Sequence, residues 1–444
     1  MFKGLLSGDS LGKRLIRAGL GSAGIKVINR LLTLVLGVFL ARGLGPEGYG
    51  IYAYAFALMT LLMVLAEAGV PTLVMREVAA AEAKKEWGLL RGMLRWAMQF
   101  VTATSVTIAL FGGVTLALVA SSLDPVSIYT YGLMLVILPL SALSKTIVHA
   151  LKGLRHVVAA VALDGLLRPA LVMAMIATCF WLWPTLQTPY MAMGAQLFSV
   201  FFVVIVALIL IAKVRPKDAK SASLIIRREI WVKSALPFVL IGGAGIINNQ
   251  TDIIMLGWFL GTEEVGRYRV AVQGAMLVGF SLQVAHGVVA PYFSKIYSQG
   301  EMARLQLLVT RSSQVVLVTA LPVAMVFILA GDLIVTWVFG KEFASAHSAL
   351  AILAIGQLVN AGFGAVGFLL NMTGHENIVA RILWVMAASN IVLNAILIPL
   401  FGMIGAAVAT AISLIITHLL LYRQVKNKLG IKSTALRSIF RTSA

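Results

Sequence analysis

Long apolar stretches alternate with short polar segments along the whole chain of 444 residues. A helix needs about 20 apolar residues to cross the ~30 Å hydrocarbon core of a bilayer. Twelve stretches meet this length, near residues 19–41, 48–70, 93–119, 127–150, 158–183, 188–212, 235–259, 266–290, 312–330, 344–370, 378–400 and 402–423. Segments of about ten alternating apolar and polar residues, which a transmembrane β-barrel requires, do not occur. The pattern therefore predicts an all-α polytopic membrane protein with twelve transmembrane helices.

The composition agrees with this class. Hydrophobic residues make up 60% of the chain and charged residues 12%, whereas soluble domains carry about 25% charged residues. The net charge of +19 would suggest a nucleic-acid partner in a soluble protein. Here the basic residues gather in loops predicted on one side of the membrane, so they indicate topology and affinity for the anionic headgroups of membrane lipids. We expect no nucleic-acid partner.

The distribution of basic residues predicts the orientation. Of the 36 Lys and Arg residues, the predicted outer loops contain only Arg42, Arg267, Arg269 and Lys341. Lys26 and Arg30 lie inside the first span, and most of the remaining basic residues fall in the N-terminal arm, the opposite loops and the C-terminal tail. Because positively charged loops stay in the cytoplasm, we expect a multi-pass protein of the cytoplasmic (inner) membrane with both termini in the cytoplasm.

Two short sequences indicate an internal repeat. "LGPEGYGIYAYA" at 44–55 matches "LGTEEVGRYRVA" at 260–271 at six positions with a constant offset of 216 residues. Each copy joins the first and second spans of a predicted six-span half, and the glycines with Pro46 are typical of a tight turn followed by a helix start. We therefore expect two six-helix lobes related by a parallel internal repeat, with a site between them near the membrane midplane.

The repeat predicts the domain organisation. We expect an N-terminal six-helix lobe over residues 1–213, a cytoplasmic basic linker over 214–233, a C-terminal six-helix lobe over 234–424, and a cytoplasmic basic tail over 425–444. The linker segment "SLIIRREIWVK" at its end is predicted to form an amphipathic helix on the membrane surface. Two parallel lobes with short loops are typical of a device that moves a substrate by rocking one lobe against the other.

Motifs of several enzyme classes are missing. The run nearest to a phosphate-binding loop, "GDSLGKRL" at 8–15, is one residue short between its glycines and ends without the Ser or Thr that would bind Mg²⁺. The zinc motif H-E-x-x-H does not occur, and the predicted outer loops are too short for a polymerase domain. We therefore expect no enzyme activity, no catalytic residue, no cofactor and no metal site.

Polar residues inside apolar spans are functional candidates, because they usually face a cavity. The first span contains Lys26, Asn29 and Arg30, and the seventh, which holds the equivalent place in the second half, contains Asn248, Asn249 and Asp252. At an offset of 220 residues, Asn29 corresponds to Asn249. The two spans are thus predicted to contribute to one polar corridor.

Three segments carry a resemblance to a known family: "LARGLGPEGYGIYAYAFALMTLLMVLAEAGVPTLVMREVA" at 40–79, "DIIMLGWFLGTEEVGRYRVA" at 252–271 and "IPLFGMIGAAVATAIS" at 398–413. The chain resembles Wzx-type polysaccharide flippases over nearly its whole length. This superfamily also holds lipid II flippases and multidrug extrusion transporters. The resemblance implies translocation of a polyprenyl-pyrophosphate-linked oligosaccharide to the outer leaflet, for O-antigen, capsule or exopolysaccharide assembly, with a polysaccharide polymerase and assembly proteins as further partners.

With such a substrate, the polar residues acquire predicted roles. Lys26 and Arg30 would face the pyrophosphate, and Arg30 suits it best because a guanidinium can donate two parallel hydrogen bonds. Asn29, Asn248 and Asn249 would bond sugar hydroxyls, and Asp252 would line the same cavity. The alternative is that Asp252 only pairs with Lys26 or Arg30 and joins the two halves.

Two further residues are candidates for gating or coupling. Glu67 could form a gate with Arg76 or Arg91, or could anchor a loop, and His286 could titrate within the pathway. Asp164 and Arg168, four residues apart, are expected to pair with each other on one helix.

Two other functions stay open at this stage. An ion-coupled antiporter of drugs or organic cations would concentrate carboxylates in its cavity, whereas Lys26 and Arg30 favour an anion. A membrane enzyme or a scaffold of envelope assembly is the third alternative.

Overall fold

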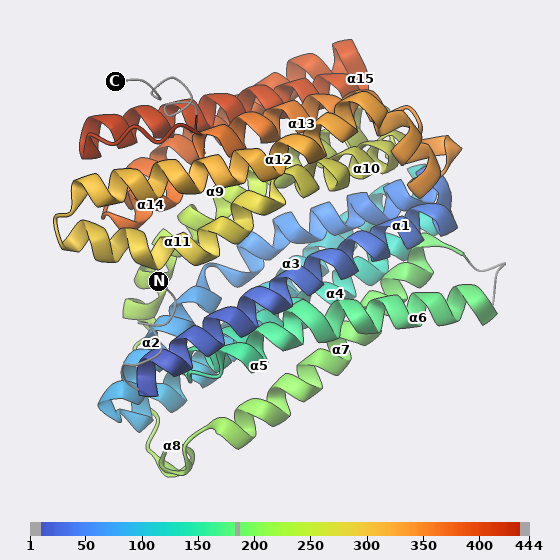
Figure 1. Ribbon diagram of the computed structural model, residues 1–444. Coiled ribbons are helices and arrows are strands. Elements are labelled where there is room, and N and C mark those ends of the chain that lie inside the picture. Colours follow the sequence, from blue (N-terminus) through green and yellow to red (C-terminus); the bar gives the residue numbers. More distant parts are fainter. Residues whose placement is uncertain (1–9, 183–186, 436–444) are drawn as a thin grey trace, which may run out of the picture. The chain divides into compact units, whose positions relative to one another are not determined.

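The computed structural model describes residues 10–182 and 187–435. All regular secondary structure in these two ranges is helical (Figure 1). The elements are α1 (Ser10–Glu67), α2 (Val70–Lys84), α3 (Trp87–Val119), η2 (Ala120–Ser122), α4 (Pro125–Gly153), α5 (Val157–Ala162), η3 (Leu163–Leu167), α6 (Arg168–Leu182), α7 (Pro189–Val214), α8 (Lys217–Ser221), α9 (Arg228–Leu260), α10 (Thr262–Val278), α11 (Phe280–Ser298), α12 (Met302–Phe339), η5 (Lys341–Phe343), α13 (Ala346–Phe363), α14 (Val366–Met372) and α15 (Glu376–Leu429). The all-α class predicted from the sequence is confirmed.

Several helices are long enough to cross a bilayer. Within the described ranges, eight helices meet the length and hydropathy needed, or nine if the bent helix α9 counts as one span. The count of twelve remains a prediction. Helices α1 and α15 each cover two predicted spans and contain a non-helical residue between them, at Gly45 and Gly402, while α10 has only 17 residues.

Exposed apolar faces identify the lipid-facing surface. On α3, the side chains of Leu110, Phe111, Val114 and Leu118 are 61–76% exposed. They share one face of the helix by their spacing. In water such a surface would cost free energy, since apolar area favours burial at about 25 cal/mol per Å². The protein is therefore a multi-pass membrane protein, in which these side chains contact lipid.

The chain forms two compact units. Unit 1 comprises Met1–Gly43 and Leu58–Gly243, and unit 2 comprises Leu44–Ala57 and Ala244–Ala444. In unit 1, α4 packs against α7, α3 and α2. In unit 2, α13 packs against α12, α15 and α10. The segment Leu44–Ala57 thus belongs with the second part of the chain, although it lies in the first predicted lobe.

The two matching loops have matching backbones. Gly45 has φ 68° and ψ 179°, and Gly261, its counterpart in the sequence, has φ 89° and ψ 178°. A positive φ with extended ψ is a conformation that only glycine adopts readily. The turn predicted at "GPEGYG" is therefore confirmed. The correspondence of the loops is local, and duplication of the whole six-span unit remains a prediction.

The two loops also contact each other within unit 2. A Cβ atom at Gly50 would collide with the carbonyl oxygen of Thr262, and one at Gly266 would collide with that of Pro46. Pro46 and Thr262 are equivalent in the repeat, as are Gly50 and Gly266. The contact is therefore symmetric, because in each loop the glycine lies against the carbonyl oxygen of the equivalent residue in the other loop. Glycine allows the two backbones to approach this closely. We call this contact the Gly50–Gly266 crossing.

The predicted amphipathic helix of the linker is only partly formed. Residues 223–227 form no helix, and helix α9 begins at Arg228. The amide of Ile225 donates to the carbonyl oxygen of Gly88 at 3.1 Å, and Trp231 is buried against Trp96 with ring centroids 5.2 Å apart. The linker is therefore held on α3 of unit 1, and this tertiary contact overrides the helical pattern of the segment.

The orientation can be tested with labels. We expect a reporter fused at Ala444, and one inserted after Lys220 in the linker, to be accessible only from the cytoplasm, because the basic residues flank these segments. A reporter inserted in the loop at Asp124, which is predicted to lie outside, serves as the control. Labelling of Ala444 or Lys220 from the outer face would reverse the predicted topology.

Candidate functional site

The predicted site residues of unit 1 lie on α1, close to charged side chains of α4 and η3. Asn29 donates to the carbonyl oxygen of Gly165 at 2.7 Å, and Thr33 donates to the carbonyl oxygen of Asn29 at 2.8 Å. Gly165 belongs to η3, a single π-helical turn, and such turns release backbone carbonyls and occur frequently at functional sites. The amide of Asn29 is thus bonded to backbone, and a role in binding sugar remains a prediction.

The two cations of α1 differ in exposure. Lys26 is exposed and Arg30 is half-buried. Lys152 of α4 lies close enough to Lys26 to interact with it electrostatically. Lys152 also interacts electrostatically with Lys145 and Asp164. With Glu67, which pairs with Lys145, the group holds four basic and two acidic side chains, so this part of unit 1 has an excess of positive charge. We call Lys26, Arg30, Lys145 and Lys152 the basic cluster.

Glu67 has a different partner from either one predicted. Its carboxylate forms an ion pair with Lys145 at 2.7 Å, and Glu67 is buried, with 8% of its surface exposed. Arg76 instead bonds Glu77 at 2.9 Å, and Arg91 donates to the carbonyl oxygen of Ala222 at 2.7 Å. In this structure Glu67 therefore pairs with Lys145 and not with Arg76 or Arg91, and a role in gating remains a prediction. Glu67 ends α1, so its ion pair ties α1 to α4.

Lys145 was not predicted as a site residue from the sequence, although it lies inside the predicted span 127–150. A lysine at such a position needs a partner or a water-filled cavity. Together with Glu67 in another span, it was a detectable candidate for a buried ion pair.

The predicted pair of Asp164 and Arg168 is confirmed. The carboxylate and the guanidinium are 3.7 Å apart. The separation is long for an ion pair, and half of the Asp164 side chain is exposed, so the pair contributes little to stability.

Removal of Lys145 should destabilise unit 1. We expect Lys145→Met to lower the free energy of unfolding by about 1–3 kcal/mol, because it leaves the buried carboxylate of Glu67 unpaired. This is less than the ~3–5 kcal/mol of a fully buried pair, since the Lys145 side chain is 39% exposed. The double variant Glu67→Gln with Lys145→Met should regain most of the loss. Thermal unfolding in detergent measures both, and equal midpoints for the parent and Lys145→Met would contradict the prediction.

In unit 2, Asp252 is held by neighbouring side chains. Its carboxylate accepts a hydrogen bond from the hydroxyl of Tyr268 at 2.7 Å and one from Thr410 at 3.4 Å, and it is only 4% exposed. The backbone amide of Ile253 donates to the same carboxylate at 2.8 Å. These contacts join α9, α10 and α15. They favour a structural role within unit 2, while contact of Asp252 with a substrate remains a prediction.

The neighbouring amides of α9 bond mainly within their own helix. Asn248 donates to the carbonyl oxygens of Ala244 at 3.0 Å and Leu383 at 3.3 Å, and the exposed Asn249 donates to Gly245 at 2.7 Å. Asn248 therefore links α9 to α15. The side chain of His286, the other candidate for coupling, lies outside the described residues.

The fold defines the class of the protein as a multi-pass helical membrane protein with the architecture of known transporters. It is similar to the inward-facing structure of a multidrug resistance transporter of the multidrug and toxic-compound extrusion family, with a TM-score of 0.77 and 15% identity over 96% of this chain and all of the other. It is also similar to a lipid II flippase in an inward closed conformation, with a TM-score of 0.70 and 16% identity over 91% of this chain and 87% of the other.

The sequence itself identifies the family. Residues 17–297 match the family described as polysaccharide biosynthesis protein, and the chain belongs to this family. A probable low-salt glycan biosynthesis flippase of Haloferax volcanii is 27% identical over 188 residues, which are 42% of this chain and 40% of that relative. The alignments span only about two fifths of the length of the curated relatives.

Proposed function

We propose that this protein is a flippase that moves a polyprenyl-pyrophosphate-linked oligosaccharide from the cytoplasmic to the outer leaflet for polysaccharide biosynthesis. The observation that carries the proposal is the family match over residues 17–297. The name of the Haloferax relative supports the same function, and the similarity to a lipid II flippase supports a fold suited to it. In this proposal the protein is a transporter of the inner membrane and catalyses no covalent chemistry.

The basic cluster supports an anionic substrate. A charged headgroup cannot enter hydrocarbon alone, because an unpaired ion in a low dielectric costs tens of kcal/mol on an idealised estimate. Lys26 and Arg30 of α1 would bind the pyrophosphate, and Lys145 and Lys152 would add to the positive potential around it. Asn29, Asn248, Asn249 and Asp252 are proposed to contact the sugar as the substrate moves, and Glu67 and His286 to take part in gating or coupling.

We also propose how the predicted lobes move during transport. Lobes at residues 1–213 and 234–424, with a basic linker at 214–233 and a tail at 425–444, would alternate between inward-open and outward-open states. Membrane lipids surround the protein, and a polysaccharide polymerase with assembly proteins would consume the delivered substrate.

An antiporter of organic cations is the second candidate, because one similar solved structure is a multidrug resistance transporter. The two functions predict opposite charge preferences. The four lysines and arginines of the basic cluster, against the carboxylates of Glu67 and Asp164 close by, favour the anion.

Depletion of the protein in its own cells tests the function. We expect polyprenyl-pyrophosphate-linked oligosaccharide to accumulate, as measured by mass spectrometry of extracted lipids, and the polysaccharide on the cell surface to disappear. Expression of the parent chain should reverse both effects. Unchanged lipid-linked sugars together with increased sensitivity to cationic drugs would exclude the flippase and favour the antiporter.

A further inference from the structure

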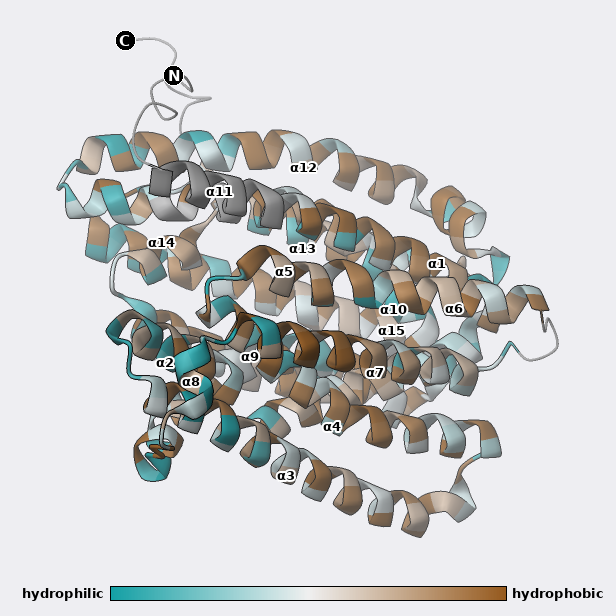
Figure 2. Cartoon of the chain, turned by 90° about the horizontal axis from the view of Figure 1, so that it is seen from below, coloured by the Kyte–Doolittle hydropathy of each residue, from teal (hydrophilic) through white to brown (hydrophobic). Residues whose placement is uncertain are grey.

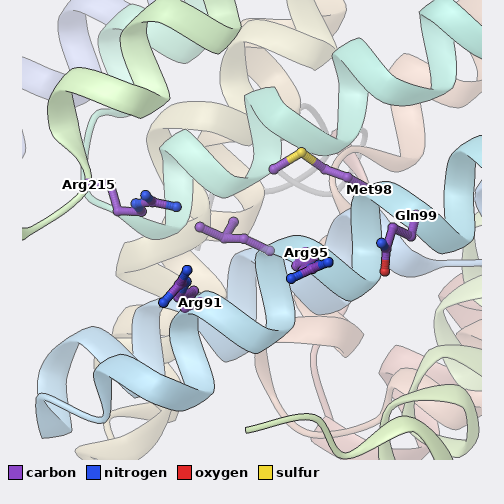
Figure 3. Close-up of a pocket in the computed structure, with 6 residues that line it drawn as sticks. Arg91, Arg95, Met98, Gln99 and Arg215 are labelled. Carbon is purple, nitrogen blue, oxygen red and sulfur yellow. The ribbon is translucent and has the colours of Figure 1, made fainter. Parts of the chain in front are cut away.

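A pocket of about 350 Å³ lies on unit 1, between the N-terminal turns of α3 and the end of α7. Its lining residues are Arg91, Leu94, Arg95, Met98, Gln99 and Arg215. Figure 3 shows Arg91, Arg95, Met98 and Gln99 along α3 and Arg215 on the opposite side. We call this the arginine pocket. Its volume is at the lower end of small-molecule sites.

The pocket combines three positive charges with an apolar wall. Arg91, Arg95 and Gln99 follow one another at intervals of four residues, so they share one face of α3. Leu94 and Met98 supply the wall beside them. The pocket therefore presents guanidinium groups from both α3 and the end of α7 beside apolar side chains of α3.

The three guanidinium groups lack a balancing carboxylate. Within the part of the chain that the structure describes, none of the ion pairs involves Arg91, Arg95 or Arg215. Arg91 donates to the carbonyl oxygen of Ala222, and the Nε atom of Arg215 is buried without a hydrogen-bond partner. Like charges gathered in this way repel each other unless an anion binds between them. The arrangement favours an anionic ligand.

The pocket lies where apolar helix meets polar surface. Arg215 directly follows the strongly apolar helix α7. Arg91 lies in the first turns of α3, which carries the lipid-facing side chains further along. Figure 2 shows hydrophilic residues around α8 and hydrophobic ones along most of α7. The pocket is therefore placed at the level of lipid headgroups, whichever side of the membrane it faces.

We propose that the arginine pocket binds an anionic phospholipid, with the phosphate held by Arg91, Arg95 and Arg215 and an acyl chain lying along Leu94 and Met98. Guanidinium groups donate paired hydrogen bonds to phosphate oxygens, and basic pockets between transmembrane helices bind acidic headgroups. The lipid would be a resident of the membrane. Its binding does not depend on the transport function, and it uses residues outside the basic cluster.

The test measures lipid retention by the purified full-length protein. The protein is reconstituted with equal amounts of phosphatidylglycerol and phosphatidylcholine, extracted in mild detergent, and examined by native mass spectrometry. We expect the parent to retain phosphatidylglycerol in preference. The double variant Arg95→Gln with Arg215→Gln should bind it roughly 10- to 30-fold more weakly, since each basic residue contributes about 1 kcal/mol to attraction by anionic lipid. Arg91 is left intact because it also holds the linker.

Two controls make the outcome decisive. The double variant Arg381→Gln with Arg423→Gln removes the same charge from two exposed positions of α15 and should keep the parent's preference. Inorganic phosphate at the same concentration as the lipid should not displace it. Equal losses in both double variants, or no preference in the parent, would overturn the site, and full displacement by inorganic phosphate would replace the lipid by a soluble anion. If the first double variant aggregates, Arg95→Gln alone, at an exposed position, tests the same point.

Discussion

Replacing Arg30 by glutamine is expected to slow flipping by at least about tenfold. Arg30 is half-buried on α1, one turn from Lys26, and we propose that it binds the pyrophosphate. A hydrogen bond to a charged group contributes about 1.5–3 kcal/mol, which corresponds to a tenfold or larger change in rate if the bond forms in the transition state. Arg30→Lys should retain part of the rate, because it keeps the charge and loses the paired geometry.

The assay uses vesicles that contain the purified protein and a lipid-linked sugar. Arg228→Gln, which removes a charge from an exposed position of the linker, is the matched control and should flip at the parent rate. A rate for Arg30→Gln equal to that of the parent would remove Arg30 from the proposed site, whereas equal losses in Arg30→Gln and Arg228→Gln would indicate a general effect of surface charge.

The same vesicles test the driving force. A pyrophosphate diester carries about two negative charges, and each is worth ~2.3 kcal/mol per 100 mV. A potential that is negative inside should therefore favour outward transfer by roughly 4–5 kcal/mol per 100 mV. The basic cluster stays with the protein, so it lowers the barrier in both directions without changing this difference. Net transfer that ignores the sign of an imposed potential would instead favour coupling to an ion.

A leucine at Gly50 or Gly266 should prevent stable folding of unit 2. The added side chain would meet backbone of the opposite loop, because a Cβ atom alone already collides with Thr262 or Pro46. Overpacking typically lowers the free energy of unfolding by about 1–3 kcal/mol. We expect a loss at the upper end of this range or beyond, because backbone atoms cannot move aside as a side chain can. Alanine at either position should cost less, yet still lower the thermal midpoint.

Gly132→Ala is the control for this prediction. Gly132 lies in α4, and a Cβ atom there meets nothing within 4 Å. Alanine is the better helix former by about 1 kcal/mol, so this variant should keep or raise the midpoint measured by thermal unfolding in detergent. If Gly50→Leu unfolds at the parent temperature, the close crossing does not contribute to stability.

Hydropathy was sufficient to predict the helical class, and turn chemistry to predict the break at Gly45. These properties are local, because a span needs only enough consecutive apolar residues and a positive φ favours glycine. The partners of the buried acids were not predictable in this way. Tyr268 and Thr410 are 16 and 158 residues from Asp252, and only the packing of three helices brings them together.

In the linker, the sequence pattern predicts more helix than the structure contains. Its "SLIIRREIWVK" segment has the pattern of a surface helix, yet the backbone at Ile225 bonds to Gly88. The contact with α3 offers this amide a partner outside the segment, and the pattern alone does not contain that information. For Glu67, both the charge and the need for a partner were apparent from the sequence, but its partner in the structure, Lys145, lies on another helix 78 residues away and was not predicted.

The placement of Leu44–Ala57 in unit 2 has a consequence for dissecting this protein into fragments. The chain passes between the units at residues 43/44, 57/58 and 243/244. A cut in the basic linker severs none of these three connections and instead divides unit 1, because residues 214–233 lie inside it. A fragment ending at residue 213 would contain Gly50 without Gly266. The complementary fragment would lack the segment Leu44–Ala57, which packs against α10. Neither fragment contains a complete folding unit, and co-expression of the two pieces is the way to recover one.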